Sequence, residues 1–127
     1  MERTKANFKA WRETVGISQQ GLADALHVDK RSIQRWEAPQ TEWMPPADAW
    51  QVREEARKNQ KAEVEELERI AGKIDLHKPV LIKYWRNQND FIAAGNTGDY
   101  QQANASARMA AYVLESNGRA VSFVYSG

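Results

Sequence analysis

Apolar side chains in the first third of the chain recur every three or four residues, the spacing that places them on one face of a helix. This spacing predicts three short helices, with inward-facing positions at Phe8, Trp11 and Val15, at Leu22, Ala23 and Leu26, and at Ile33 and Trp36. Gly16 is suited to end the first helix, and Ser18 and Asp29 are suitable N-caps for the second and third. His27 and Val28 then form a tight turn between the second and third helices.

A fourth, longer helix is predicted from about residue 47 to about residue 74. Ala38-Pro39 ends the third helix, and Pro46 suits the first turn of the fourth, because proline lacks the N–H that a helix interior requires. The middle of the fourth helix is polar and typical of a solvated spacer. Its last part has a narrow apolar stripe at Val64, Leu67, Ile70, Ala71 and Ile74. Two alternatives are open: the stripe packs on a partner, or it packs on the chain's own second half.

The pattern changes period after Pro79. Residues 80–85 and 120–125 are rich in β-branched and aromatic side chains and are predicted to be strands. Between them, a helix is predicted from about residue 100 to about residue 117, capped by Gly118, and a shorter one over residues 90–94. The predicted fold class is therefore mainly α with a small C-terminal α+β part, divided into domains at residues 1–58 and 59–127.

Composition narrows the class of protein. The 127 residues are 42% hydrophobic and 28% charged, which is typical of a globular chain. The absence of cysteine excludes disulfide scaffolds and thiol nucleophiles, and the two histidines, His27 and His77, are too few for a His-built metal site. No bilayer-spanning run, signal-peptide pattern, phosphate-binding Gly-rich loop, Ser/His/Asp arrangement or HExxH motif is present. We therefore expect a cytoplasmic protein that is not an enzyme and uses no metal or other cofactor.

Charge is distributed unevenly along the chain. Residues 1–36 carry seven Lys/Arg and four Asp/Glu, a net charge of +3, whereas the remaining residues carry 11 and 13, a net charge of −2. A basic segment of this size is also common on ordinary solvated surfaces. The asymmetry nevertheless favours a polyanion-binding end.

Residues 16–37 contain the candidate chemistry. Two short helices joined by a tight turn, with basic side chains at the exposed start of the second, are typical of a helix-turn-helix unit. The major groove of DNA admits one α-helix, and arginine contacts guanine bidentately through O6 and N7. The candidate DNA-binding residues are Gln19, Lys30, Arg31, Ser32, Gln34 and Arg35.

The same segment resembles the Cro/CI-type, XRE-like helix-turn-helix regulators over roughly residues 5–58. The matching positions are Arg12, residues 16–19, Leu22-Ala23, Leu26, Val28, Ile33 and Trp36-Glu37. The resemblance implies a lambda-repressor-like bundle that binds double-stranded DNA, with Gln19 at a phosphate and with Lys30, Arg31 and Arg35 at bases and nearby phosphates. Gly21 stands where that family has glutamate, which removes the reciprocal capping bond to the second helix. His27 stands where the family has glycine, so it must accept a positive φ or alter the turn.

The order of elements after residue 58 resembles that of small repressors with a dimerising tail, such as anti-CRISPR-associated autorepressors. Two strands make a poor sheet alone, so we expect a homodimer with the strands at or near the contact. Two recognition helices about 34 Å apart then match a palindromic operator, as expected for a repressor. No small-molecule ligand or membrane association is indicated. The alternative is an antitoxin-type protein, whose tail binds a partner protein while its head represses the operon.

Three expectations concern individual side chains. Arg12 and Glu37 are predicted to form a partly buried ion pair between the first helix and the end of the third. Glu65 and Arg69 are predicted to pair across one turn of the fourth helix. The core, rather than a nucleic-acid surface, is the expected location of the tryptophans Trp11, Trp36, Trp43 and Trp50.

Overall fold

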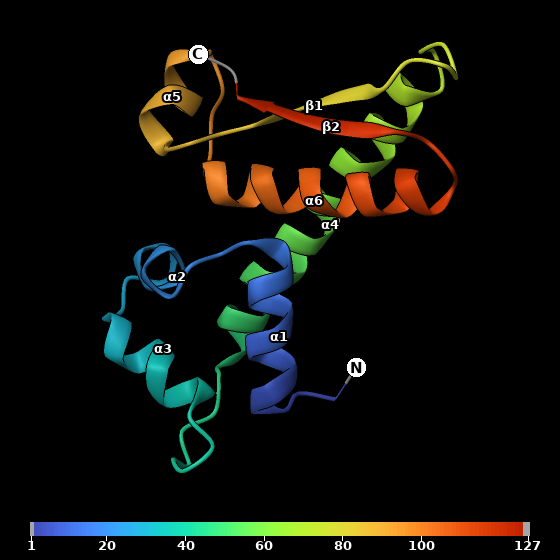
Figure 1. Cartoon of the computed structure of the whole chain (residues 1–127). Helices are drawn as coiled ribbons and strands as arrows, with labels where there is room; N and C mark the ends of the chain where they lie inside the picture. Colours follow the sequence, from blue (N-terminus) through green and yellow to red (C-terminus); the bar gives the residue numbers. More distant parts are fainter. Residues whose placement is uncertain (1, 126–127) are drawn as a thin grey trace. The chain divides into compact units, whose positions relative to one another are not determined.

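The computed structural model of the chain describes residues 2–125, which form two compact units divided between Lys58 and Asn59. Within these residues the chain is mainly helical, with six α-helices and a two-stranded parallel sheet (Figure 1). This architecture agrees with a mainly α fold class with a small α+β part. Residues 126 and 127, the last two of the predicted second domain, lie outside the described residues. No helix within residues 2–125 has both the length and the apolar character needed to cross a bilayer.

The predicted helices and strands are all present. The first unit contains α1 (Lys5–Val15), α2 (Gln19–Leu26), α3 (Lys30–Glu37) and the start of α4 (Ala47–Ala71). The second unit contains the rest of α4, β1 (Val80–Tyr84), α5 (Gln88–Ala93), α6 (Tyr100–Ser116) and β2 (Val121–Tyr125). The helix α4 ends slightly earlier than predicted, at Ala71.

Residues directly before or after α1, α2 and α3 determine where these helices begin and end. Ser18 Oγ accepts a hydrogen bond from the Gly21 N–H at 2.9 Å, and Asp29 caps α3 in the same way, so both predicted caps are confirmed. Gly16 and His27 end α1 and α2 with positive φ angles of 82° and 55°. His27 therefore accepts the left-handed backbone conformation, which is costly for a residue with a side chain.

The core of the first unit is built around Phe8. Its ring contacts Trp36 and Trp50 edge-on, with ring centroids 6.5 and 5.1 Å away, and all three residues are buried. The predicted core positions of Trp36 and Trp50 are therefore confirmed. Trp11 is only partly buried, and the guanidinium of Arg53 lies 5.6 Å from its ring centroid.

In the second unit, β1 and β2 pair with each other in parallel. The register runs from Val80 opposite Val121 to Tyr84 opposite Tyr125. Figure 1 shows the two strands side by side along α6, and the connection between them contains α5 and α6. The buried apolar residues that join β1 to α6 are Val80, Ile82, Ala107, Ala111 and Leu114.

Trp85, directly after β1, is buried against Phe91 of α5, with ring centroids 5.4 Å apart. The side chain of Asn104 on α6 satisfies both backbone polar groups of Trp85. Asn104 Oδ1 accepts from the Trp85 N–H at 2.9 Å, and Asn104 Nδ2 donates to the Trp85 carbonyl at 2.8 Å. A buried asparagine paired in this way holds the end of β1 on α6.

The apolar stripe near the end of α4 packs, at its last positions, within the second unit. Ala71 belongs to the core of that unit, and Ile74 packs against it. Arg119 Nη1 donates to the Ala71 carbonyl at 2.8 Å and adds a polar link to the same place. The stripe was predicted to pack either on a partner or on the chain's own second half. Ala71 and Ile74 pack on the chain's own second half.

Two predictions for α4 are wrong. The middle of the helix is not a solvated spacer, because it contains a buried row at three- or four-residue spacing, formed by Arg53, Ala56, Gln60 and Val64. Because Arg53 and Gln60 in this row are polar, the apolar residues of the sequence alone do not show the spacing of its buried positions. The predicted pair of Glu65 with Arg69 is absent: Arg69 Nε donates to Glu66 at 2.9 Å, and Glu65 lies 3.9 Å from Lys61 Nζ. Glu66 is three residues from Arg69, and its two carboxylate oxygens accept hydrogen bonds from Nε and Nη2 of the guanidinium.

Candidate nucleic-acid interface

The outer face of α3 is rich in positive charge. Lys30, Arg31, Gln34 and Arg35 are all exposed, while Ile33 is fully buried on the opposite side. Within residues 2–125, none of the three basic side chains on this helix forms an ion pair. A helix with this arrangement presents cationic hydrogen-bond donors to any polyanion that reaches it.

Asp29 fixes the start of α3. Its Oδ1 accepts from both the Ser32 N–H at 2.9 Å and the Ser32 hydroxyl at 3.1 Å. These bonds, helped by the positive charges of Arg35 and Arg31, hold the pKa of Asp29 below its ordinary value. The hydroxyl of Ser32, one of the predicted DNA-binding residues, is therefore engaged in the cap of the helix.

This cap makes α3 sensitive to acid. Because the pKa of Asp29 is lower in the folded chain, its stabilising effect is complete above its ordinary value of 3.8 and is lost as the pH falls through the folded value. Asp29→Asn keeps a capping oxygen but does not titrate. We expect the wild-type chain to have the higher Tm at pH 7 and to lose that advantage below pH 3.8, measured by circular dichroism. A difference in Tm that stays constant with pH would contradict this role.

The predicted ion pair of Arg12 with Glu37 is confirmed. Arg12 Nε and Nη2 donate to the two carboxylate oxygens of Glu37 at 2.5 and 2.9 Å, and both residues are buried. Arg12 Nη1 also donates to the Ile17 carbonyl at 2.8 Å. The pair therefore connects α1, the segment before α2 and the end of α3.

Gln19 belongs to the same network. Its Nε2 donates to Glu37 Oε1 at 3.1 Å, which orients the side-chain amide and leaves its second N–H for another acceptor. Gln19 is also the first residue of α2, where the backbone N–H has no acceptor within the helix. The side chain and the backbone of Gln19 are therefore both able to donate to a phosphate.

Lys5 holds the loop that follows α3, a role that the sequence analysis missed. Its Nζ donates to the carbonyls of Arg35 at 2.9 Å, Trp36 at 3.2 Å and Trp43, and to Thr41 Oγ1 at 2.9 Å. The ammonium group donates to carbonyls in the last turn of α3 that have no acceptor role within the helix, and its positive charge interacts favourably with the helix dipole. The acceptors lie 30 or more residues from Lys5, so no local signal in the sequence indicates this contact.

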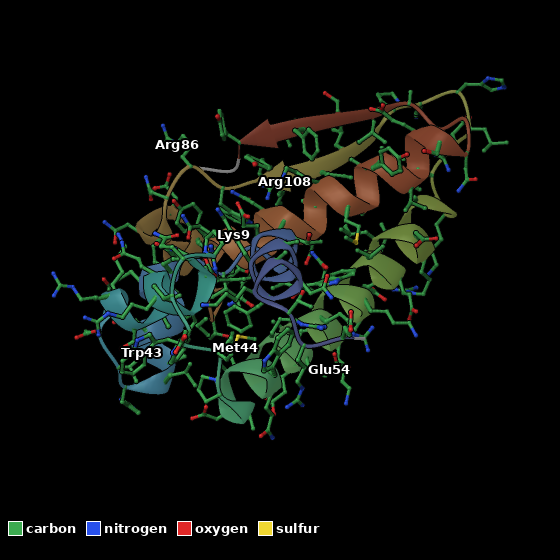
Figure 2. All side chains as sticks on the ribbon, turned by 90° about the horizontal axis from the view of Figure 1, so that it is seen from below. Lys9, Trp43, Met44, Glu54, Arg86 and Arg108 are labelled. Carbon is green, nitrogen blue, oxygen red and sulfur yellow. The ribbon has the colours of Figure 1, made fainter. Side chains whose placement is uncertain are left out.

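Trp43 is not in the core, which corrects the prediction. Its side chain is 61% exposed, and the guanidinium of Arg35 lies 5.6 Å from its ring centroid. Figure 2 labels Trp43 and its exposed neighbour Met44 on the loop before α4. The sites beside Phe8 are filled by other tryptophans, so Trp43 covers the last exposed arginine of α3.

A second feature lies in the second unit, beside the C-terminal half of β2 and the end of β1. A hollow of about 440 Å³ is lined by Tyr84, Arg108, Phe123, Val124 and Tyr125. The hollow is mostly aromatic, with Tyr84 and Phe123 in edge-on contact at 5.3 Å. Phe123 and Tyr125 remain 44% and 66% exposed.

No protein-family model and no curated protein matches this chain. Among residues 2–125, no group of three carboxylate or histidine side chains is placed to hold a metal ion. The basic face of α3 and the aromatic hollow beside β2 are the two surface features considered below as the basis of a function.

Proposed function

We propose that this chain is a sequence-specific DNA-binding transcriptional regulator, acting as a homodimeric repressor of a palindromic operator. In this proposal, α2 and α3 form a helix-turn-helix of the Cro/CI type, and α3 is the recognition helix. The observation that carries it is the set of exposed basic side chains without ion pairs on α3: Lys30, Arg31 and Arg35.

Two properties of the first unit support this role. The caps at Ser18 and Asp29 and the turn at His27 fix the path from α2 to α3, so side chains on α3 are presented from a rigid base. The donors fall into two kinds. Gln19 provides amide donors suited to phosphate, whereas Lys30 and Arg31, in the first turn of α3, are suited to base edges in the major groove.

Alanine substitutions should separate these two kinds of contact. Arg31→Ala should relax the preference at one or two base pairs of each half-site by about 1–3 kcal/mol per lost bidentate contact. Gln19→Ala should weaken binding almost equally for all sequences, because phosphate contacts position a protein without specifying a base. The measurement is competition binding, using the duplex that the full chain selects from a randomised library and its single-base variants.

Lys9→Ala is the matched control, because Lys9 is an exposed basic residue on α1 (labelled in Figure 2) and is not one of the proposed DNA-binding residues. We expect it to leave the ranking of sequences unchanged. An unchanged ranking with Arg31→Ala would remove that residue from the base contacts. A wild-type chain that selects no duplex would end the proposed function.

The homodimer in this proposal forms through β2. The strand is exposed along most of its length, and its sequence VSFVY contains no charge and no proline. Natural proteins usually protect an unpaired edge strand with charged residues or proline. An aromatic edge strand without them favours pairing with another strand. A second copy supplies an identical strand, and a two-fold axis places two α3 helices for two half-sites.

A further inference from the structure

Trp43 combines a high exposure with a specific contact. An indole that is 61% exposed contributes little to the core, yet the Arg35 guanidinium lies 5.6 Å from the centroid of its ring. That distance is within the range of a cation–π interaction, for which tryptophan is the strongest aromatic partner. Within residues 2–125, Arg35 forms no ion pair, and the carboxylate of Asp29 interacts with it only through longer-range electrostatics.

The backbone on both sides of this contact is fixed by one lysine. Lys5 Nζ donates to the carbonyl of Arg35 and to the carbonyl of Trp43, so both members of the stack are attached to the same ammonium group. Thr41 Oγ1 also bonds to the Arg35 carbonyl, at 2.5 Å, and closes the loop between them. The backbone positions from which the indole and the guanidinium extend are therefore fixed relative to each other.

We infer that Trp43 is a positioning residue for Arg35 and thereby helps to determine the base preference of α3. This inference rests on the proposed DNA-binding function and deepens it. Trp43 itself contacts no base. It restricts the rotamers of Arg35, so that the guanidinium presents one orientation to the DNA.

The chemistry of arginine explains why an aromatic face suits this purpose. All five N–H donors of the guanidinium lie in its plane, so a ring stacked on its face leaves every donor available. A stacked arginine can therefore still donate two bonds to O6 and N7 of guanine. An unstacked Arg35 would lose more side-chain entropy on binding and would contact several acceptors with similar affinity.

Four single variants and one double variant test the inference in the full-length chain. The duplex is the one that the wild-type chain selects from a randomised library. Trp43→Ala should weaken binding about 3- to 10-fold, the loss expected from releasing one ordered side chain. It should also flatten preference at the same base pair that Arg35→Ala flattens. Trp43→Phe retains an aromatic face and should recover most of the affinity. Met44→Ala, at the neighbouring residue, which is 50% exposed, should have no effect.

A double variant distinguishes positioning from direct contact. If Trp43 acts through Arg35, then Trp43→Ala should cause no further loss of affinity in the Arg35→Ala chain. An equal loss in both backgrounds would mean that Trp43 contacts the DNA itself and would overturn the inference. Unchanged affinity and preference for Trp43→Ala alone would also overturn it.

A measurement without DNA tests the stack separately. The side-chain protons of Arg35 should show an upfield ring-current shift in the NMR spectrum of the wild-type chain, and Trp43→Ala should remove it. Absence of that shift would end the inference while leaving the proposed function intact. A wild-type chain that selects no duplex would end both, so the two failures are distinguishable.

Discussion

Glu37→Ala is expected to lower the free energy of unfolding by about 3–5 kcal/mol, because it leaves the buried charge of Arg12 without a partner. Both side chains are more than nine-tenths buried, and the carboxylate accepts two bonds from Arg12 and one from Gln19. Removal of the acceptor therefore disrupts the connection between α1, α2 and α3 at one point. Urea unfolding of the wild-type and variant chains measures the difference.

Two further chains control for this effect. Glu66→Ala breaks an ion pair with Arg69 in which both side chains are more than half exposed, and it should leave the unfolding transition almost unchanged. The double variant Arg12→Met, Glu37→Leu replaces both charges and should be more stable than Glu37→Ala alone. A loss for Glu37→Ala no greater than that for Glu66→Ala would show that the buried pair does not hold the first unit together.

Phe123→Asp is expected to convert the proposed dimer into a monomer and to weaken operator binding by about 10²- to 10⁴-fold, the advantage gained from linking two binding sites. Phe123 lies in the aromatic hollow beside β2, and a carboxylate there would be desolvated by a second copy. Light scattering should give about twice 14.5 kDa for the wild-type chain and 14.5 kDa for the variant.

Leu81→Asp is the matched control for charge. Leu81 is exposed on the neighbouring strand β1 and lies outside the hollow, so its variant should remain dimeric. Tyr125→Asp, at a more exposed position of the hollow, provides a second test if Phe123→Asp loses its fold. A wild-type chain that is monomeric at micromolar concentration would refute the dimer and, with it, the palindromic operator.

Most of the features that the sequence predicted correctly depend on residues close together in the chain. The pair of Arg12 with Glu37, which are 25 residues apart, is the exception, and it was predicted from positions that match the resembled family. Ser18 and Asp29 lie beside the helices that they cap, and the helical period alone places Ile33 inside and Arg31 outside. The same local signals predicted the exposed face of α3, which makes up most of the candidate site. Local hydrogen bonding and burial on one face are enough to specify these features.

Most of the features that it missed depend on residues far apart, the local pairing of Arg69 with Glu66 being the exception. The contacts of Lys5 with the loop after α3 and the burial of Arg53 beneath two tryptophan rings require the folded first unit. Trp43 was predicted to lie in the core, like the other three tryptophans near it in sequence, rather than at a nucleic-acid surface. Which tryptophans fill the space around Phe8 is decided by packing, and that information is not contained in any short window of sequence.

The parallel pairing of β1 with β2 also affects how fast the second unit folds. Parallel strands cannot be joined by a tight turn, and here all of α5 and α6 lies between them. The chain must lose the conformational entropy of closing this long connection before the strand pairing stabilises it. In the first unit, by contrast, α2 and α3 are neighbours in sequence and pack directly on each other. Folding rates fall as the sequence separation of native contacts rises, so the second unit forms later, and its uncharged aromatic strand stays unpaired until then.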